Sequence, residues 1–430
     1  MIRAFWFLIL LAFLSLGAAL ISDSPGTASI KWLGYQIESS IGILFLFVIS
    51  CSLILMTVLR VFFFIRNAPK QVTNARFEWR RRRGYKALTQ GMLAVAAGDA
   101  IEARRLSKKA ETLLAEPPLT MLLSAQAAQL SGDNKAAGRF FEEMAQQPQT
   151  KYLGLSGKLK QAIQDGDKTG ALQLAEQASN LNPKADNVTA TLFDLQVKNG
   201  DWEGAEDTVK RSIKLKTISA DTGRRRRAVL LFLQSIEKED DGRLDEALQH
   251  AKKANNLAPN FVPATVRIAR LLQSSGKRRK AAAIIEETWV SNPHPHLAEV
   301  MKDLAPGAGP QEIMRTLENL ANYNKEHLES HIAIATSALA AGMLQESREH
   351  LEAVSSGNPS ARVCRHMAEL VEAENGNVEV SREWLRRATD ADPDSAWICE
   401  DCGNTIASWE PLCSRCEKFD SLSWRTPPRV

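Results

Sequence analysis

Four short stretches of the sequence share one pattern: GDAIEA (residues 98–103), GDNKAA (132–137), GDKTGA (166–171) and GDWEGA (200–205). Each begins with Gly-Asp, ends with alanine, and starts 34 residues after the stretch before it. Glycine can adopt the left-handed conformation that ends a helix, and aspartate can cap the start of the next helix. The small side chain five positions after the glycine lets the two helices cross closely. The pattern therefore predicts a helix, a tight turn and a second helix, repeated along the chain.

The same pattern continues toward the C-terminus with two changes of phase. Gly242 and Gly276 are again 34 residues apart, as are Gly342 and Gly376, and the phase is lost only around residues 224–227 and 306–310. The small residues that follow these glycines are Ala247, Ala281, Ser347 and Ser381, and prolines that end second helices stand at Pro183, Pro259, Pro293, Pro359 and Pro393. This period is typical of tetratricopeptide repeats and predicts an all-α solenoid over residues 91–394.

A solenoid of this kind indicates a binding protein. Its repeats bury their apolar faces only against neighbouring repeats, so they stack into a curved surface with a groove. Such a groove fits extended or helical peptides of other proteins. We therefore expect the partners of residues 91–394 to be proteins.

Two long apolar stretches precede the repeats, at residues 2–21 and 41–65. About 20 apolar residues in a helix are enough to cross a hydrocarbon core of roughly 30 Å. A signal peptide is the alternative for the first stretch, but its length and the second stretch that follows favour a transmembrane hairpin over residues 1–66. The polar loop between the stretches contains Lys31, whereas the basic helix predicted at residues 67–90 contains Arg80, Arg81, Arg82 and Arg83. The positive-inside rule then places both termini and the soluble part in the cytoplasm.

The C-terminal segment, residues 395–430, contains four closely spaced cysteines: Cys399, Cys402, Cys413 and Cys416. Their spacing, C-x2-C, ten residues and C-x2-C, predicts two knuckles whose four thiolates surround one metal ion. Zinc is the expected metal, and iron in a rubredoxin-like site would use the same ligands. A closed set of four thiolates leaves no position for water, so we expect a structural role. Trp397, Trp409, Phe419 and Trp424 are expected to form the core of this small domain.

Catalytic and nucleic-acid-binding signatures are absent from the sequence. It has no phosphate-binding loop, dinucleotide fingerprint, H-E-x-x-H or G-x-S-x-G motif, which favours a protein that is not an enzyme. The close histidine pairs, His294 with His296 and His327 with His331, are expected to be solvated side chains. The arginine runs lack the fold and the interleaved aromatic residues of a nucleic-acid-binding surface, so no nucleic acid is expected as a partner.

The order of parts in the N-terminal third carries a family resemblance. The first span, GYQIESS (residues 34–40), the second span, the arginine-rich helix and LTQGMLAVAAGD (residues 88–99) together resemble the proteobacterial HemY family. This resemblance implies two transmembrane segments and tetratricopeptide repeats at the bacterial inner membrane. It also implies an association with haem (porphyrin) biosynthesis and no catalytic role.

The cysteine segment with its flanking tryptophans is similar to the rubredoxin-type tail of other membrane-anchored tetratricopeptide proteins, notably the lipopolysaccharide assembly protein LapB. Proteins of that kind regulate envelope lipid synthesis and have one span. The sequence thus supports a membrane scaffold that gathers haem-biosynthesis proteins. The alternatives are a LapB-like regulator of envelope lipid synthesis and a metal- or redox-sensing module.

Overall fold

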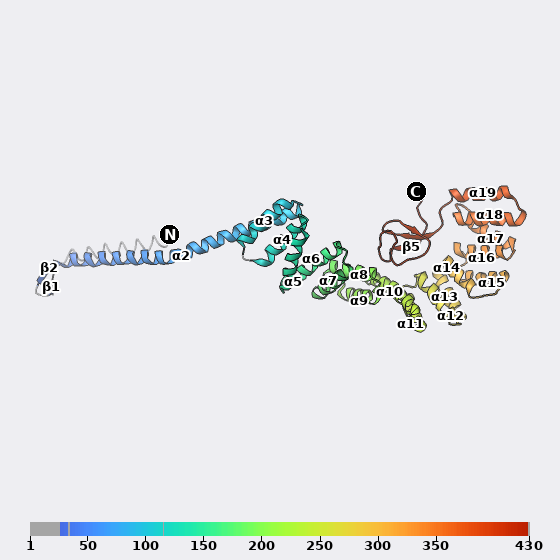
Figure 1. Cartoon of the computed structure of the whole chain (residues 1–430), viewed down its shortest axis with the longest axis horizontal. Helices are drawn as coiled ribbons and strands as arrows, with labels where there is room; N and C mark the ends of the chain where they lie inside the picture. Colours follow the sequence, from blue (N-terminus) through green and yellow to red (C-terminus); the bar gives the residue numbers. More distant parts are fainter. Residues whose placement is uncertain (1–25, 33–34, 115, 429–430) are drawn as a thin grey trace. The chain divides into compact units, whose positions relative to one another are not determined.

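A computed structural model describes residues 26–32, 35–114 and 116–428 of the chain. The described residues belong to two compact units, Met1–Ala137 and Gly138–Val430 (Figure 1). The first span predicted from the sequence, residues 2–21, lies outside the described residues.

The described part of the first unit starts with a β-hairpin that precedes a long helix. Strands β1 (Thr27–Trp32) and β2 (Tyr35–Ser40) pair antiparallel, with Thr27 opposite Ser40. The helix α2 (Ile41–Ala96) follows, and α3 (Ala100–Leu113) and α4 (Pro117–Leu130) complete the elements that lie wholly within this unit. The polar loop between the predicted spans is therefore a hairpin.

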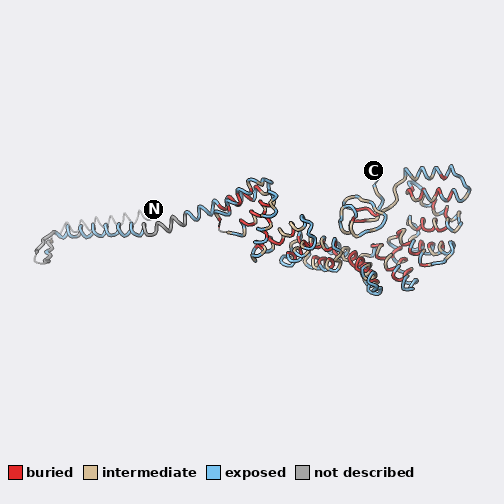
Figure 2. Tube along the Cα trace, viewed as in Figure 1, coloured by how far each residue is buried: buried red, intermediate tan, exposed pale blue. Residues whose placement is uncertain are grey.

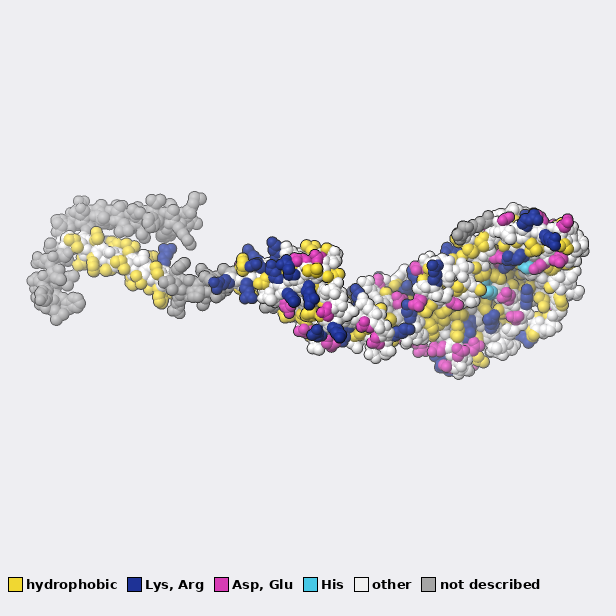
Figure 3. Space-filling model, turned by 45° about the horizontal axis from the view of Figure 1, so that its top comes forward, with side chains coloured by type: hydrophobic (Ala, Val, Ile, Leu, Met, Phe, Trp, Pro, Cys, Tyr) yellow, Lys and Arg dark blue, Asp and Glu magenta, His cyan; other side chains and the backbone are white. Residues whose placement is uncertain are grey.

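Helix α2 has two different parts. Its first 23 residues, Ile41–Phe63, are long and apolar enough to cross a membrane, and the side chains described there are not buried. Figure 3 shows this band of hydrophobic side chains along the start of the helix. At the other end of α2, Ala87 and Leu88 are buried against the helices that follow. Among the described residues one candidate span is present, and a single helix joins that span to the first repeat.

The remaining helices follow in pairs along the chain. They are α5 (Asn134–Gln146), α6 (Lys151–Gln164), α7 (Lys168–Leu181), α8 (Asp186–Lys198), α9 (Trp202–Leu215), α10 (Ala220–Asp240), α11 (Leu244–Leu257), α12 (Val262–Ser274), α13 (Arg278–Ser291), α14 (Pro295–Asp303), α15 (Pro310–Ala321), α16 (Leu328–Ala340), α17 (Leu344–Ser355), α18 (Ala361–Asn375) and α19 (Val378–Asp390). We call the helix before each turn the first helix of its pair and the helix after it the second helix.

The structure confirms the physical interpretation of the repeat. All eight phased glycines have φ between 63° and 78°. The carboxylates of Asp99, Asp167 and Asp201 each accept a hydrogen bond from the backbone N–H three residues later, at 2.9–3.0 Å. The small residues five positions after the glycines are at most 5% exposed. Figure 2 shows the resulting buried stripes where neighbouring helices face each other.

One helix pair lies where the sequence period is lost. Helices α14 and α15 flank residues 304–309, where Gly307 has φ of 87°. This turn has no Gly-Asp step, and α14 has only 9 residues. The helix pair therefore does not follow the 34-residue period of the sequence. A helix pair is thus present in the region where the sequence period is lost.

The chain ends in a small antiparallel sheet with strand order β4-β3-β5. Its strands are β3 (Ala396–Cys399), β4 (Thr405–Ile406) and β5 (Leu422–Arg425). The segment before β3 is fixed to the start of α18, because the Asp394 carboxylate accepts a hydrogen bond from the Arg362 N–H at 2.7 Å. The cysteine domain is thus tied to the last repeat at its entry.

Candidate metal centre and its docking face

Two similar backbone turns hold the four cysteines. In the first turn the Gly403 N–H donates to the Cys399 carbonyl at 3.0 Å, and in the second the Glu417 N–H donates to the Cys413 carbonyl at 2.8 Å. Gly403 has φ of 70° and Glu417 has φ of 56°, so both turns close through a left-handed residue directly after the second cysteine. Glycine takes this conformation without strain, whereas Glu417 takes it with a side chain.

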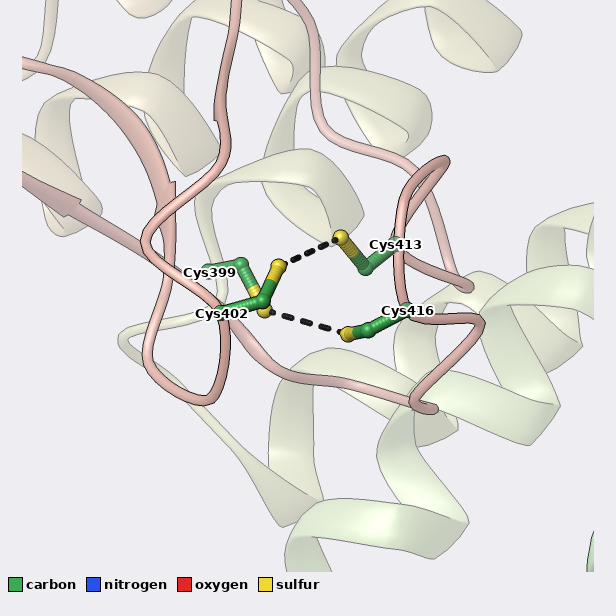
Figure 4. A group of neighbouring side chains, drawn as sticks. All are labelled: Cys399, Cys402, Cys413 and Cys416. Atoms are coloured by element: carbon green, nitrogen blue, oxygen red, sulfur yellow. Dashed lines mark hydrogen bonds between the residues drawn. The ribbon is translucent and has the colours of Figure 1, made fainter.

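The four sulfur atoms converge on one point (Figure 4). They lie within 4.8 Å of one another, with 3.6 Å between Cys399 and Cys416 and 3.6 Å between Cys402 and Cys413. A tetrahedral ion with metal–sulfur bonds of about 2.3 Å needs sulfur atoms about 3.8 Å apart. A disulfide would need about 2.0 Å, and all four thiols are free. The four cysteines could therefore bind one metal ion.

The surroundings of Cys399 favour its thiolate form. Burial opposes ionisation, but hydrogen bonding with Ser421 and the backbone N–H groups of Cys402 and Asp401 outweighs it, and lowers the pKa of Cys399 to about 6. The Ser421 hydroxyl lies 3.2 Å from the sulfur atom. The pKa of Cys413 is also lowered, whereas those of Cys402 and Cys416 are raised, so without a metal the thiolate form is favoured at the first cysteine of each C-x2-C pair.

The core of the cysteine domain differs in part from the sequence prediction. Trp397 is 5% exposed and packs with Leu422, Cys399 and Cys413, as predicted. Trp409 and Trp424 also pack against this core, as predicted, and Trp409 packs against the solenoid as well. Phe419 was predicted to belong to the same core, but it packs against helices of the solenoid and is absent from the cysteine cluster. The aromatic area of Trp409 and Phe419 therefore fixes the cysteine domain to the repeats.

The aromatic part of this contact involves three solenoid rings. The Trp409 ring meets Phe232 of α10 edge-on at 5.4 Å and Phe261, the N-cap of α12, at 4.9 Å. The Phe419 ring meets Phe193 of α8 at 5.3 Å. Edge-to-face pairs at such separations contribute about 0.5–1.5 kcal/mol each beyond the area they bury.

The charged part of the contact comes from the arginine run at residues 224–227, where the repeat phase was lost. In the structure this run lies in the first turns of α10. The Arg225 guanidinium donates two hydrogen bonds of 2.8 Å to the Asp420 carboxylate, whose side chain is only 8% exposed. Arg225 also lies over the Phe261 ring at 4.4 Å. The run of four arginines at the loss of the repeat phase was the sequence signal of this contact.

The pKa of Asp420 reflects the exclusion of water from the contact between the cysteine domain and the solenoid. Burial raises the pKa of its carboxyl, and the Arg225 guanidinium acts against that rise. At the rim of the contact, the Lys198 ammonium pairs with the Glu417 carboxylate at 2.6 Å, with both side chains largely exposed. Exposed pairs of this kind contribute about 0–1 kcal/mol, so the buried pair is the stronger determinant of position.

The histidine pairs are not simple solvated side chains. His294, the N-cap of α14, is 1% exposed, and its ring lies 4.4 Å from the Trp424 ring and 5.8 Å from the Trp397 ring of the cysteine domain. Burial, together with the nearby His296 and Arg362 charges, lowers the pKa of His294 to about 3. The prediction of a solvated side chain was wrong here because the cysteine domain covers this histidine.

The second histidine pair is divided between two roles. His327 caps α16 by accepting a hydrogen bond from the Glu329 N–H at 3.1 Å. His331, one turn later, places its Nδ1 3.0 Å from Nδ1 of His350 on the second helix α17. Both of these side chains are partly buried, so this pair too differs from the expectation.

These contacts define one surface, which we call the docking face. It consists of Phe193, Arg225, Phe232, Phe261 and His294. The five residues come from α8, α10, α12 and α14 or their N-caps, which are the first helices of four consecutive pairs. The cysteine domain therefore lies along the first helices of the solenoid.

Comparison with known proteins supports the N-terminal resemblance. Residues 26–132 match the family model described as HemY protein N-terminus. The chain is also 24% identical over 411 residues to the probable magnetosome protein Mms48 of Magnetospirillum gryphiswaldense, an alignment that covers 94% of this chain and 89% of that protein. The resemblance of the N-terminal third to the HemY family is thus confirmed for the matched residues.

Several solved structures are similar to parts of the chain. A MamA crystal structure has a TM-score of 0.26 at 16% identity and covers 41% of this chain and 91% of its own. The structure described as the TPR2AB-domain:pHSP90 complex of yeast Sti1 has a TM-score of 0.27 at 13% identity and covers 71% of this chain and 98% of its own. A tetratricopeptide repeat protein from Parabacteroides merdae has a TM-score of 0.27 at 16% identity, covering 55% and 98%.

Proposed function

We propose that this chain is a scaffold of the bacterial inner membrane that gathers partner proteins along the first helices of its cytoplasmic solenoid. The fold and the HemY N-terminal match support the coarser statement, a membrane-associated helical-repeat scaffold. The observation that carries the proposal is α2, in which one helix contains both the candidate span and the first helix of the first repeat. A helix shared in this way tethers bound partners close to the membrane.

The cytoplasmic orientation is supported by the charges that follow the candidate span. Arg80, Arg81, Arg82 and Arg83 lie on α2 beyond Phe63, and basic residues near a span remain on the cytoplasmic side. A second span at residues 2–21 would place the N-terminus on the same side, and we propose that topology. The reducing cytoplasm also keeps the four thiols available for a metal.

The partners that we propose are enzymes of haem (tetrapyrrole) biosynthesis, on the basis of the HemY resemblance in residues 26–132. A scaffold would shorten the distance that poorly soluble intermediates travel between enzymes. It needs no catalytic group of its own. We propose zinc as the metal of Cys399, Cys402, Cys413 and Cys416, where it completes the small C-terminal domain.

Two other functions are favoured by the cysteine domain. Its spacing resembles the tail of LapB, which would make the chain a regulator of envelope lipid synthesis. Its contact with four first helices would also suit a metal-sensing module, because a change at the metal would reach the solenoid directly.

Co-purification from native membranes tests the proposal. The tagged chain, solubilised in mild detergent, is expected to enrich haem-pathway enzymes in mass spectrometry, and the enrichment should vanish for a chain that lacks residues 98–393. A chain with Cys51→Ser, a change confined to the candidate span, serves as the matched control and should retain the partners. Enrichment of envelope lipid enzymes would move the assignment to the LapB-like function. An unchanged set of proteins after the deletion would contradict the scaffold.

A further inference from the structure

The docking face combines aromatic rings with the guanidinium of Arg225, and Arg226 lies beside it, on the helices that we propose to bind partners. Phe232 and Phe261 pack edge-on at 5.4 Å, and the Arg226 guanidinium lies over Phe193 at 4.9 Å. Without the cysteine domain, these rings would lose the cover that Trp409 and Phe419 give them. Aromatic and arginine side chains are the residue types that dominate the energetics of protein interfaces.

We propose that the docking face is itself a protein-binding site, which the cysteine domain covers while its metal is bound and uncovers when the metal is lost. The inference rests on the proposed scaffold function and adds its regulation. The partner that fits is a peptide segment with an aromatic residue directly followed by an acidic one. The chain presents this chemistry to its own face in Phe419 and Asp420.

The chemistry of the pair Phe419 and Asp420 follows from the contacts. The Phe419 ring packs against Phe193 and against the cluster that contains Val197 and Leu230. The Asp420 carboxylate takes both hydrogen bonds from Arg225. The docking face thus offers an apolar site for an aromatic ring and the Arg225 guanidinium for a carboxylate. A peptide segment that replaces Phe419 and Asp420 therefore needs an aromatic and an acidic residue at neighbouring positions.

The metal controls this contact because the contacting residues flank its ligands. Trp409 stands four positions before Cys413, and Phe419 stands three positions after Cys416. The strands of the domain have only 4, 2 and 4 residues, which is too little structure to hold these rings in place without the metal. Loss of the metal would therefore release Trp409 and Phe419 together.

A charge reversal separates docking from metal binding. The Asp420→Lys chain is expected to retain its metal, because no metal ligand is changed, while the introduced ammonium repels Arg225. Hydrogen exchange of α8, α10 and α12 should then rise relative to the wild type. The matched control is Asp401→Lys, an exposed carboxylate of the same domain that pairs with Lys418 instead of the solenoid. Combining Asp420→Arg with Arg225→Asp should restore the wild-type protection.

Peptide binding tests the uncovered site. The probe is a fluorescent peptide of residues 417–424, EKFDSLSW, which contains no cysteine. The control peptide has Ala in place of the Phe and the Asp. If the covered state predominates, uncovering the face should tighten the apparent affinity for EKFDSLSW by about tenfold or more. The wild-type chain stripped of metal by a chelator should show the same gain, and the Asp401→Lys chain should not.

Two results would overturn the inference. One is equal peptide affinity in the wild-type, chelated and Asp420→Lys chains. The other is unchanged protection of α10 and α12 after the metal is removed. Neither result would affect the co-purification of partners with the wild-type chain, so the scaffold function and its regulation by the cysteine domain fail separately.

Discussion

Replacing Cys413 by serine is expected to abolish stoichiometric metal binding and to unfold the C-terminal sheet. Cys413 is 1% exposed, and its sulfur lies 3.6 Å from that of Cys402 within the four-sulfur cluster. Structural zinc sites contribute an apparent free energy of about 10–16 kcal/mol to the folding of small domains, and three thiolates retain only part of it. Metal analysis by mass spectrometry checks the loss, and trypsin cleavage near Lys418 checks the unfolding.

The same samples identify the metal. One zinc per chain in colourless protein is the expected result for the wild type, whereas the visible absorbance of a ferric tetrathiolate would assign iron. Cys364→Ser removes a buried thiol outside the cluster and should leave the metal content unchanged. Retention of one metal per chain by the Cys413→Ser chain would refute the four-cysteine assignment.

Replacing Ala281 by leucine is expected to destabilise the solenoid around α13. Ala281 is fully buried within the cluster that contains Ile268, Ile285 and Trp289, at the position where two helices cross. Three added carbon atoms have no space there, and overpacking of this kind costs about 1–3 kcal/mol. Hydrogen exchange of α12 and α13 in the presence of mild denaturant measures the change.

Ala283 provides the matched control, because it lies on the same helix two residues later and is exposed. The Ala283→Leu chain should exchange like the wild type. Equal destabilisation by the two substitutions would mean that the small residue after the glycine does not mark the helix crossing.

The repeats and the cysteine cluster could be predicted because their determinants are local. The turn at Gly200 depends on the left-handed conformation of the glycine and on the carboxylate of its neighbour, Asp201. Both residues stand within the six-residue pattern, so the sequence predicts the turn. The C-x2-C spacing likewise fixes each knuckle within a few residues. The turn at Gly307 lacks the aspartate and stands outside the period, so the pattern did not locate this helix pair within the predicted solenoid.

The docking face could not be predicted because it joins residues that are far apart in the chain. Arg225 and Asp420 are separated by 195 positions, and neither belongs to a motif. Phe419 was assigned to the domain core because so small a domain needs aromatic residues to form one. Its contacts with the solenoid, and those that Trp409 makes besides its core contacts, depend on how the helices stack, which the period of the repeat does not specify.

The most direct test of the scaffold is photo-crosslinking in native membranes from two exposed leucines of one helix pair. Leu153 lies on the first helix α6 and is 41% exposed, and Leu181 lies on the second helix α7 and is 48% exposed. With a photoreactive residue at each position in turn, we expect adducts to partner proteins from position 153 and few from position 181. Equal adducts from both positions, or none from position 153, would contradict a scaffold that binds its partners along the first helices.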